Sequence, residues 1–310
     1  MIQWGIAINL REPVSEIVEK AVVADRGGID SIWITDYPAV RVSPILASAI
    51  AQKTERCRIG VGLLSPLIYP PKQIVQYMST LIKHYGNRFD LLIGPGDKNR
   101  LTDIGVGFGK GSAITDRLAE SLESIRKGLI DYEDCRVLLA AQGAKMIEIS
   151  RNSDGVLLNY SDPEMIKWAR ETLGNTPDTF EIGVFPPTFI GEAVQCEEQS
   201  SIRTAAGIVA LGVSSSTRKR FGLNQMLQPA LSLLKERGSI DESVINLINQ
   251  SVINRFCVCE TIEGVCNRMS QFRNLGATLV VFGPPQGATL DGVKQLIQAK
   301  RACEQQITRS

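Results

Sequence analysis

Two acidic residues of this 310-residue chain stand where expected strands give way to loops. Asp36 follows an apolar run at 31–35, and Asp97 follows another at 88–93. A carboxyl group near a reacting nitrogen or carbonyl can give or take a proton, so both are candidates for general acid–base catalysis. If both face one pocket, repulsion and partial burial should raise the pKa of at least one. The alternative is that each only caps the helix that follows it.

A phosphate-binding turn is a second candidate. The segment Gly143-Ala144-Lys145 opens an expected helix directly after an apolar run at 137–141. Free backbone N–H groups and the positive end of the helix dipole attract anions there, and Lys145 adds a charge. The glycine-rich segment 283–287 is a further candidate, although such glycines often serve only a turn that needs positive φ.

The cysteines and the histidine give weaker signals. The chain has seven cysteines, and their odd number and irregular spacing argue against a complete disulfide framework, so we expect free thiols on buried faces. Cys257 and Cys259 could form a ligand pair, but without a nearby histidine they are a weak metal signal. His84 is the only histidine and is expected to be structural, so no metal site is predicted.

The elements that must position these residues alternate between strand and helix. Strands are expected at 2–9, 31–35, 58–64, 88–93, 137–141, 156–159, 180–184 and 277–282, with helices at 13–26, 45–53, 72–85, 114–129 and 290–304 and from 144 and 163 onward. This alternation predicts a parallel sheet. Eight strands without a G-x-G-x-x-G after the first favour a closed (β/α)₈ barrel. Its active site would lie where the strands end.

One long region interrupts this rhythm. From 200 to 274 the pattern is helical throughout, without a clear strand. We therefore predict a single TIM-barrel domain over 1–310, with 188–274 as a mostly helical elaboration between strands seven and eight.

Composition narrows the class of protein. Lys and Arg number 34 against 33 Asp and Glu, and a net charge of +1 argues against a nucleic-acid binder that relies on bulk positive charge. No apolar run approaches the ~20 residues of a membrane span, and the first residues do not resemble a secretory signal. We expect a cytoplasmic protein that acts on a small molecule, without nucleic-acid or membrane partners.

Several segments carry a family resemblance when they are taken in order: 34–36 (ITD), 94–98 (GPGDK), 141–146 (AQGAKM), 154–157 (DGVL) and 283–287 (GPPQG). The chain resembles the coenzyme F420-dependent methylenetetrahydromethanopterin reductases of the bacterial-luciferase-like superfamily. The resemblance runs from about Gly5 to the final helix. It implies a TIM barrel with an insertion after strand seven, bound F420 at the mouth, and a homo-oligomer, either a dimer or a tetramer.

The resemblance also implies roles for individual residues. Asp36 and Asp97 match acidic residues of the family's pocket. The third strand would be bulged, with a cis peptide joining Gly62 and Leu63, and would support the deazaflavin ring. The expected cofactor-binding residues are Gly62, Leu63, Leu64, Gln142, Gly143, Ala144, Lys145 and Asn159, of which 142–145 would lie near the F420 phosphate.

The chain departs from the family pattern in three places. Ala7 stands where the family usually has a glutamate, Tyr37 stands where it has a histidine, and about twenty residues are missing near 132–136. The lost carboxylate could have assisted proton movement around the substrate's nitrogens. Three functions stay open: an F420-dependent oxidoreductase that transfers a hydride to a C1-pterin or related acceptor, an FMN-dependent luciferase-like monooxygenase, and a non-catalytic F420-binding paralogue.

Overall fold

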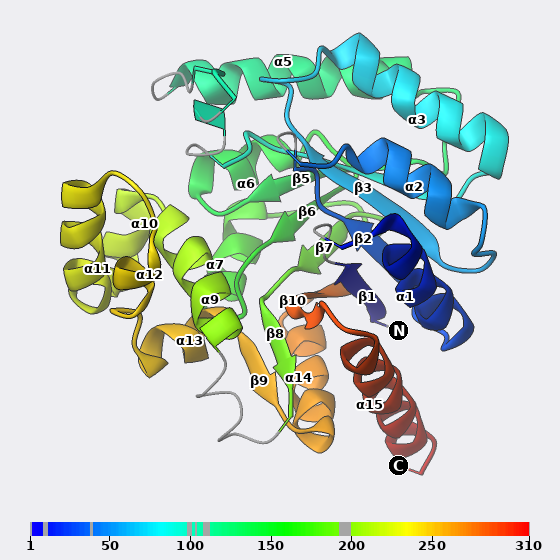
Figure 1. The fold of residues 1–310 in the computed structure, drawn as a ribbon. Helices are drawn as coiled ribbons and strands as arrows, with labels where there is room; N and C mark the ends of the chain where they lie inside the picture. Colours follow the sequence, from blue (N-terminus) through cyan, green and yellow to red (C-terminus); the bar gives the residue numbers. More distant parts are fainter. Residues whose placement is uncertain are drawn as a thin grey trace.

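Eight parallel strands close into a barrel in the computed structural model, which describes residues 2–8, 12–37, 40–97, 101–102, 104–107, 112–191 and 200–309 (Figure 1). Around the barrel the order is β1-β10-β7-β6-β5-β4-β3-β2. The strands are β1 (Gln3–Ile8), β2 (Ser31–Ile34), β3 (Arg58–Leu64), β4 (Phe89–Ile93), β5 (Arg136–Ala141), β6 (Gly155–Leu158), β7 (Glu181–Val184) and β10 (Leu279–Gly287). The predicted (β/α)₈ barrel is confirmed.

The outer ring consists of α1 (Val14–Arg26), α2 (Ser43–Ala51), α3 (Pro71–Tyr85), α5 (Ser112–Gly128), α6 (Ala144–Ser150), α7 (Pro163–Leu173), α14 (Ile262–Asn274) and α15 (Leu290–Arg309). Local chemistry sets several of their starts. Pro163 occupies the first turn of α7, and the Asp162 carboxylate accepts the N–H groups of Glu164 and Met165. Packing of α15 against α1 and α14 completes the ring.

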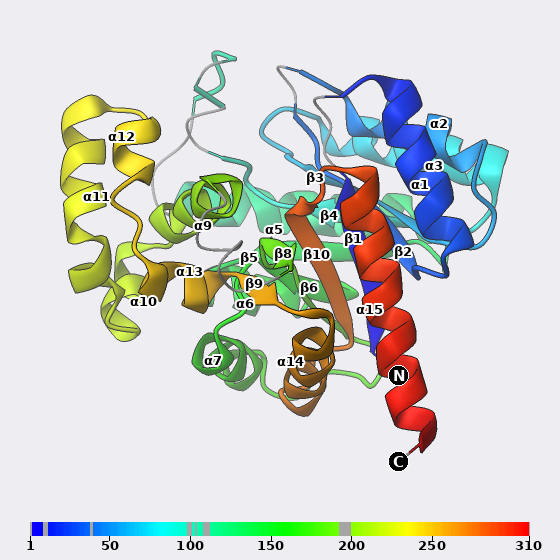
Figure 2. The same cartoon turned by 60° about the horizontal axis from the view of Figure 1, so that its bottom comes forward.

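The segment between β7 and α14 is an insertion. It holds β8 (Thr188–Ile190), α9 (Ser200–Gly212), α10 (Ser215–Arg220), α11 (Leu223–Arg237), α12 (Glu242–Ile245), α13 (Gln250–Phe256) and β9 (Val258–Glu260). Figures 1 and 2 show α10, α11 and α12 standing off one side of the barrel. The expectation of helix throughout 200–274 is wrong at β9, which pairs in parallel with β8. A strand of three residues is too short to show the alternation of apolar and polar side chains, and β8, with which it pairs, is distant in the sequence.

The largest side chain of the barrel-interior cluster is Trp33. It is buried, and its indole N–H donates to Ser31 Oγ at 3.0 Å. Glycines on the neighbouring strands make room for it, since a Cβ on Gly60 would lie 2.2 Å from the indole and one on Gly5 3.1 Å from it. Leu92, Leu157 and Val281 join the same interior cluster. The barrel is thus a packed core and not a pore.

A buried ionic network closes the N-terminal end of the barrel. Asp90 is fully buried and accepts hydrogen bonds from the guanidinium groups of Arg58 and Arg136. Arg136 also pairs with Glu181 at 2.5 Å. Burial alone would raise the pKa of Asp90, but the hydrogen bonds from Arg136 and Arg58 outweigh it and hold that pKa below its usual value.

Some cysteines are oxidised. A disulfide joins Cys266 of α14 to Cys303 of α15, 37 residues apart, and Cys259 is disulfide-bonded as well. The expectation of free thiols is wrong for these three residues. The packing of α14 against α15 brings Cys266 and Cys303 together, which their spacing in the sequence does not reveal. Cys57 and Cys135 are buried free thiols, and burial raises the pKa of each to about 12. Among the described helices, none is long and apolar enough to cross a membrane.

Candidate active site at the barrel mouth

A layer of side chains near the mouth of the barrel is apolar. It consists of Ala7, Leu63, Ala140 and Phe185, from β1, β3, β5 and the end of β7, and all four belong to the interior cluster or pack on it. Alternate strands contribute one layer in such barrels. Given the strand order, Leu63 lies across the ring from Phe185, and Ala7 lies across from Ala140. We call these four residues the apolar floor.

The remaining four strands supply the rim above this floor, with Gly94, Asn159 and Gly283 among its residues. A Cβ on Gly94 would lie 2.5 Å from Leu63 Cδ1, and one on Gly283 would lie 2.9 Å from Phe185 Cε2. These glycines therefore leave space for the floor side chains. Among the described residues, the buried Oδ1 of Asn159 has no hydrogen-bond partner. Such an orphaned acceptor suits a ligand that brings an N–H donor into the mouth.

The third strand is bulged, as the resemblance implies. Its pairing with β4 shifts register between Val61 and Leu64, and the Gly62–Leu63 peptide is cis, which confirms that prediction. Gly62 has φ +124°, and a Cβ there would lie 2.3 Å from the carbonyl oxygen of Leu92. Only glycine fits this site. Leu63 thereby reaches the floor, whereas the Leu64 side chain is buried in the core cluster that the barrel shares with its helices.

Asp36 is buried at the end of β2, with 7% of its surface exposed. Its Oδ1 accepts the Ser43 N–H at 2.8 Å, and its Oδ2 accepts the Tyr69 hydroxyl at 3.0 Å. Burial raises the pKa of Asp36, and these hydrogen bonds only partly oppose it. The direction agrees with the expectation for one of the two carboxyls, and burial is its main cause. Asp36 also ties the start of α2 to the loop after β3.

Asp97 has a different environment. It is exposed in the loop after β4, where its backbone carbonyl accepts the Leu101 N–H at 3.0 Å. The Ser65 hydroxyl donates to the Pro95 carbonyl at 2.8 Å and joins this loop to the end of β3. Lys98, the last residue of the GPGDK segment, lies outside the described residues. Asp36 is thus buried after β2, whereas Asp97 is an exposed residue of the loop after β4.

The turn after β5 faces the insertion. Gln142 donates from Nε2 to the carbonyl of Val209 in α9 at 3.2 Å. A Cβ on Gly143 would find Thr217 Oγ1 at 3.6 Å and Ser214 Oγ at 3.7 Å. Ala144 and Lys145 are exposed in the first turn of α6. The hydroxyls opposite the turn lie some seventy residues further along the chain, and no motif in the sequence pointed to them.

The second loop that was predicted to bind phosphate, 283–287, makes its contacts within the protein. Gln286 is buried, accepts the Ile190 N–H at 2.8 Å and donates to the Gly292 carbonyl at 2.7 Å. A Cβ on Gly287 would lie 2.0 Å from the Ala7 carbonyl oxygen. These glycines permit close packing, and the loop holds the insertion and α15 against the barrel.

The two positions that depart from the family pattern lie at one side of the mouth. Ala7 is buried in the floor, and Tyr37 donates its N–H to the Arg41 carbonyl at 3.1 Å. Arg41 in turn donates to the Glu12 carbonyl at 3.1 Å, and the buried Lys20 pairs with the Glu12 carboxylate. The loops that follow β1 and β2 are therefore linked.

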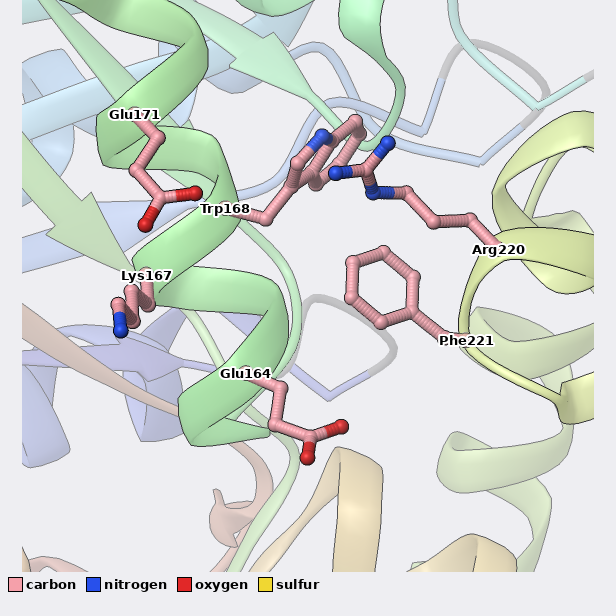
Figure 3. Close-up of a pocket in the computed structure, with 6 residues that line it drawn as sticks. All are labelled: Glu164, Lys167, Trp168, Glu171, Arg220 and Phe221. Carbon is pink, nitrogen blue, oxygen red and sulfur yellow. The ribbon is translucent and has the colours of Figure 1, made fainter.

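A cleft of about 480 Å³ lies outside the strand barrel, between α7 and the end of α10. Figure 3 shows Trp168 of α7 meeting Phe221 and Arg220 there. The two rings meet edge to face at 5.3 Å, and the guanidinium carbon of Arg220 lies 5.5 Å from the Trp168 ring centre. These contacts attach the insertion to α7 and are separate from the strand ends. Among the described residues, no group of three or more His, Cys, Asp or Glu could hold a metal.

Comparison with known families extends over almost the whole chain. Residues 3–279 match the luciferase-like monooxygenase family. A 5,10-methylenetetrahydromethanopterin reductase of Methanolobus tindarius is 22% identical, over 95% of this chain and 98% of its own. An F420-dependent glucose-6-phosphate dehydrogenase of Rhodococcus erythropolis is 31% identical, over 87% of this chain and 88% of its own.

Solved structures share the fold. The coenzyme F420-dependent tetrahydromethanopterin reductase from Methanopyrus kandleri superposes with a TM-score of 0.83 at 18% identity, covering 96% of this chain and 98% of that one. An F420-dependent secondary alcohol dehydrogenase with an F420–acetone adduct gives a TM-score of 0.72 at 16% identity, covering 97% and 99%. At these identities the likeness establishes the barrel with its insertion.

Proposed function

Because this chain belongs to the luciferase-like monooxygenase family, and within it to a group of F420-dependent oxidoreductases, we propose that it transfers a hydride between coenzyme F420 and a C1-pterin of the methylenetetrahydromethanopterin type or a related acceptor. The observation that carries the proposal is the mouth itself. It has an apolar floor for a flat ring and, in the Asn159 Oδ1, an acceptor without a partner.

When bound, F420 supplies a hydride, and the protein contributes position and electrostatics. Leu63 and the bulge around Gly62 would support its ring, with the Leu64 backbone beside them, and Asn159 would accept an N–H at its edge. The phosphate would lie at the turn after β5. Three features support this placement of the phosphate: the position of Gln142, the open space beside Gly143, and the exposed first turn of α6 with Ala144 and Lys145.

The acid–base residues that we propose are Asp97 and Asp36. Asp97 is exposed at the mouth, so it can exchange a proton between solvent and a substrate nitrogen or carbonyl. Asp36 holds a proton to higher pH than an ordinary aspartate because it is buried, and the Tyr69 hydroxyl is in contact with it. Asn variants of each test this role: turnover should fall ~10²-fold while F420 affinity is retained.

We further propose a cytoplasmic homo-oligomer, either a dimer or a tetramer. Exposed apolar side chains near the starts of α1 and α2 support an association surface: Ile45 is 69% exposed, Val40 51% and Val14 38%. Ile45→Lys should lower the molar mass measured by light scattering. An unchanged mass in the wild type and the variant, equal to one chain, would remove this part of the proposal.

Titration of the protein with F420 and with FMN tests the cofactor. We expect F420 to bind and FMN to bind at least ten-fold more weakly. A Cβ at position 143 would come no closer to the protein than ordinary van der Waals contact, so the space beside Gly143 is open. Gly143→Val should weaken F420 binding by ten-fold or more, because the added side chain would occupy the space proposed for the ligand. Lys145→Ala should weaken binding most at low salt, with Lys127→Ala on α5 as the matched control.

The outcomes separate the alternatives. Preferential binding of FMN would favour a flavin-dependent monooxygenase on the same barrel. Unchanged F420 affinity in both the Gly143 and Lys145 variants would remove the turn after β5 from the site. Binding of F420 without turnover of any acceptor would favour a non-catalytic paralogue, and Ala7→Glu would then be the restoration to attempt.

A further inference from the structure

We propose that Phe185 is a specificity-determining residue, whose ring receives a flat, uncharged ring of the hydride acceptor on the side of the mouth opposite Leu63. This inference rests on the proposed F420-dependent function and deepens it, because it assigns the acceptor its own part of the apolar floor.

Three contacts position Phe185. Its N–H donates to the Leu158 carbonyl at 2.5 Å, which fixes the backbone at the end of β7. Its side chain packs on the barrel-interior cluster from above. Its ring edge lies against Gly283, where a Cβ would come within 2.9 Å of Cε2. The residue is nevertheless only partly buried, and its place directly after β7 puts it at the mouth of the barrel.

The layout of the floor separates two binding areas. Leu63 and Phe185 come from strands on opposite sides of the ring, and the two residues between them are Ala7 and Ala140. Alanine side chains are short, so the middle of the floor stays low between the two larger groups. A carrier supported by the bulge at Leu63 leaves the Phe185 side for the acceptor, and hydride transfer needs the two ligands together over one floor.

The chemistry of the site selects a flat ring. An exposed aromatic face binds another ring by offset or edge-to-face contact, which adds to the benefit of burying apolar area. All four floor residues are apolar, so a charged group placed on them would lose its hydration without compensation. A pterin ring fits this description, whereas a sugar phosphate does not.

The test uses Phe185→Leu, which keeps an apolar side chain but removes the aromatic ring. The matched control is Phe189→Leu, the same change at a half-buried position in β8. F420 affinity is measured by fluorescence titration. Binding of 5,10-methylenetetrahydromethanopterin to the protein loaded with oxidised F420 is measured by calorimetry, so that the readout does not depend on turnover.

We expect Phe185→Leu to weaken pterin binding about 3- to 10-fold, as the loss of one ring contact predicts, with F420 affinity within two-fold of the wild type. Phe189→Leu should change neither. A shift in F420 affinity instead would assign Phe185 to the carrier. No shift in either affinity, or no pterin binding by a wild type that binds F420, would overturn the inference. Failure of the wild type to bind F420 would instead refute the proposed function.

Discussion

Replacing the buried carboxylate of Asp90 by an amide should destabilise the barrel strongly. Two guanidinium groups converge on this side chain, with Arg58 Nη2 2.6 Å from Oδ1 and Arg136 Nη2 2.6 Å from Oδ2. In Asp90→Asn, one oxygen becomes an NH₂ group that faces donors, and the two arginines lose their counter-charge. Removal of one partner from a buried ion pair costs about 3–5 kcal/mol of unfolding free energy.

The dependence on pH gives this prediction a second test. The folded-state pKa of Asp90 lies below its unfolded value of 3.8, so its stabilisation is present above that value and is lost as pH falls through the folded pKa. Urea unfolding, followed by tryptophan fluorescence, gives the unfolding free energy of the wild type and the variant. The two should differ by the full amount at pH 7 and by less well below pH 3.8. Asp116→Asn, at an exposed site on α5, is the matched control and should stay within ~0.5 kcal/mol. A loss under ~1 kcal/mol for Asp90→Asn would show that the buried carboxylate contributes little to the stability of the barrel.

Three further predictions concern stability and the site. A Cys266→Ser, Cys303→Ser double variant should lose about 4 kcal/mol of unfolding free energy, as expected for a 37-residue separation; a reductant should destabilise the wild type by more than it destabilises the variant. Asp36→Asn should be neutral or slightly stabilising at pH 7. The pKa of Asp36 is raised in the folded state, so the stabilisation from its carboxyl is present below the unfolded pKa of 3.8 and is lost as pH rises through the folded pKa. An Asp36→Asn variant whose unfolding free energy varies with pH as that of the wild type does would contradict this. Gly62→Ala should destabilise by about 2 kcal/mol or more in urea titration, because φ is +124° and the added Cβ would lie 2.3 Å from a carbonyl oxygen; a tolerated alanine would show that the bulge is not restricted to glycine.

The strands of the barrel could be predicted because their signals are local. The apolar run 58–64 coincides with β3, and Pro163 marks the first turn of α7. The mouth could be located from the same pattern, since the ends of parallel strands meet on one side. That Asp36 and Asp97 come shortly after two of these strands could be predicted from sequence order alone.

The environment of each side chain could not be predicted in this way. Nothing near Asp36 in sequence indicates that Tyr69 donates to it, or that burial raises its pKa. The hydroxyls of Ser214 and Thr217 lie opposite the turn at Gly143 because the insertion returns to the end of β5. The pairing of β8 with β9 and the disulfide between α14 and α15 depend likewise on contacts between distant segments.

A single-turnover experiment measures whether the protein transfers a hydride from F420 to the pterin. The protein is loaded anaerobically with reduced F420 and mixed with 5,10-methylenetetrahydromethanopterin, and the return of oxidised F420 is followed by its fluorescence. We expect one oxidised F420 per active site, with one hydride gained by the acceptor carbon and one proton by its nitrogen, and a slower rate in Asp97→Asn. Oxidation of F420 that proceeds equally without the pterin, or a protein that binds FMN and consumes oxygen instead, would rule out the proposed hydride transfer.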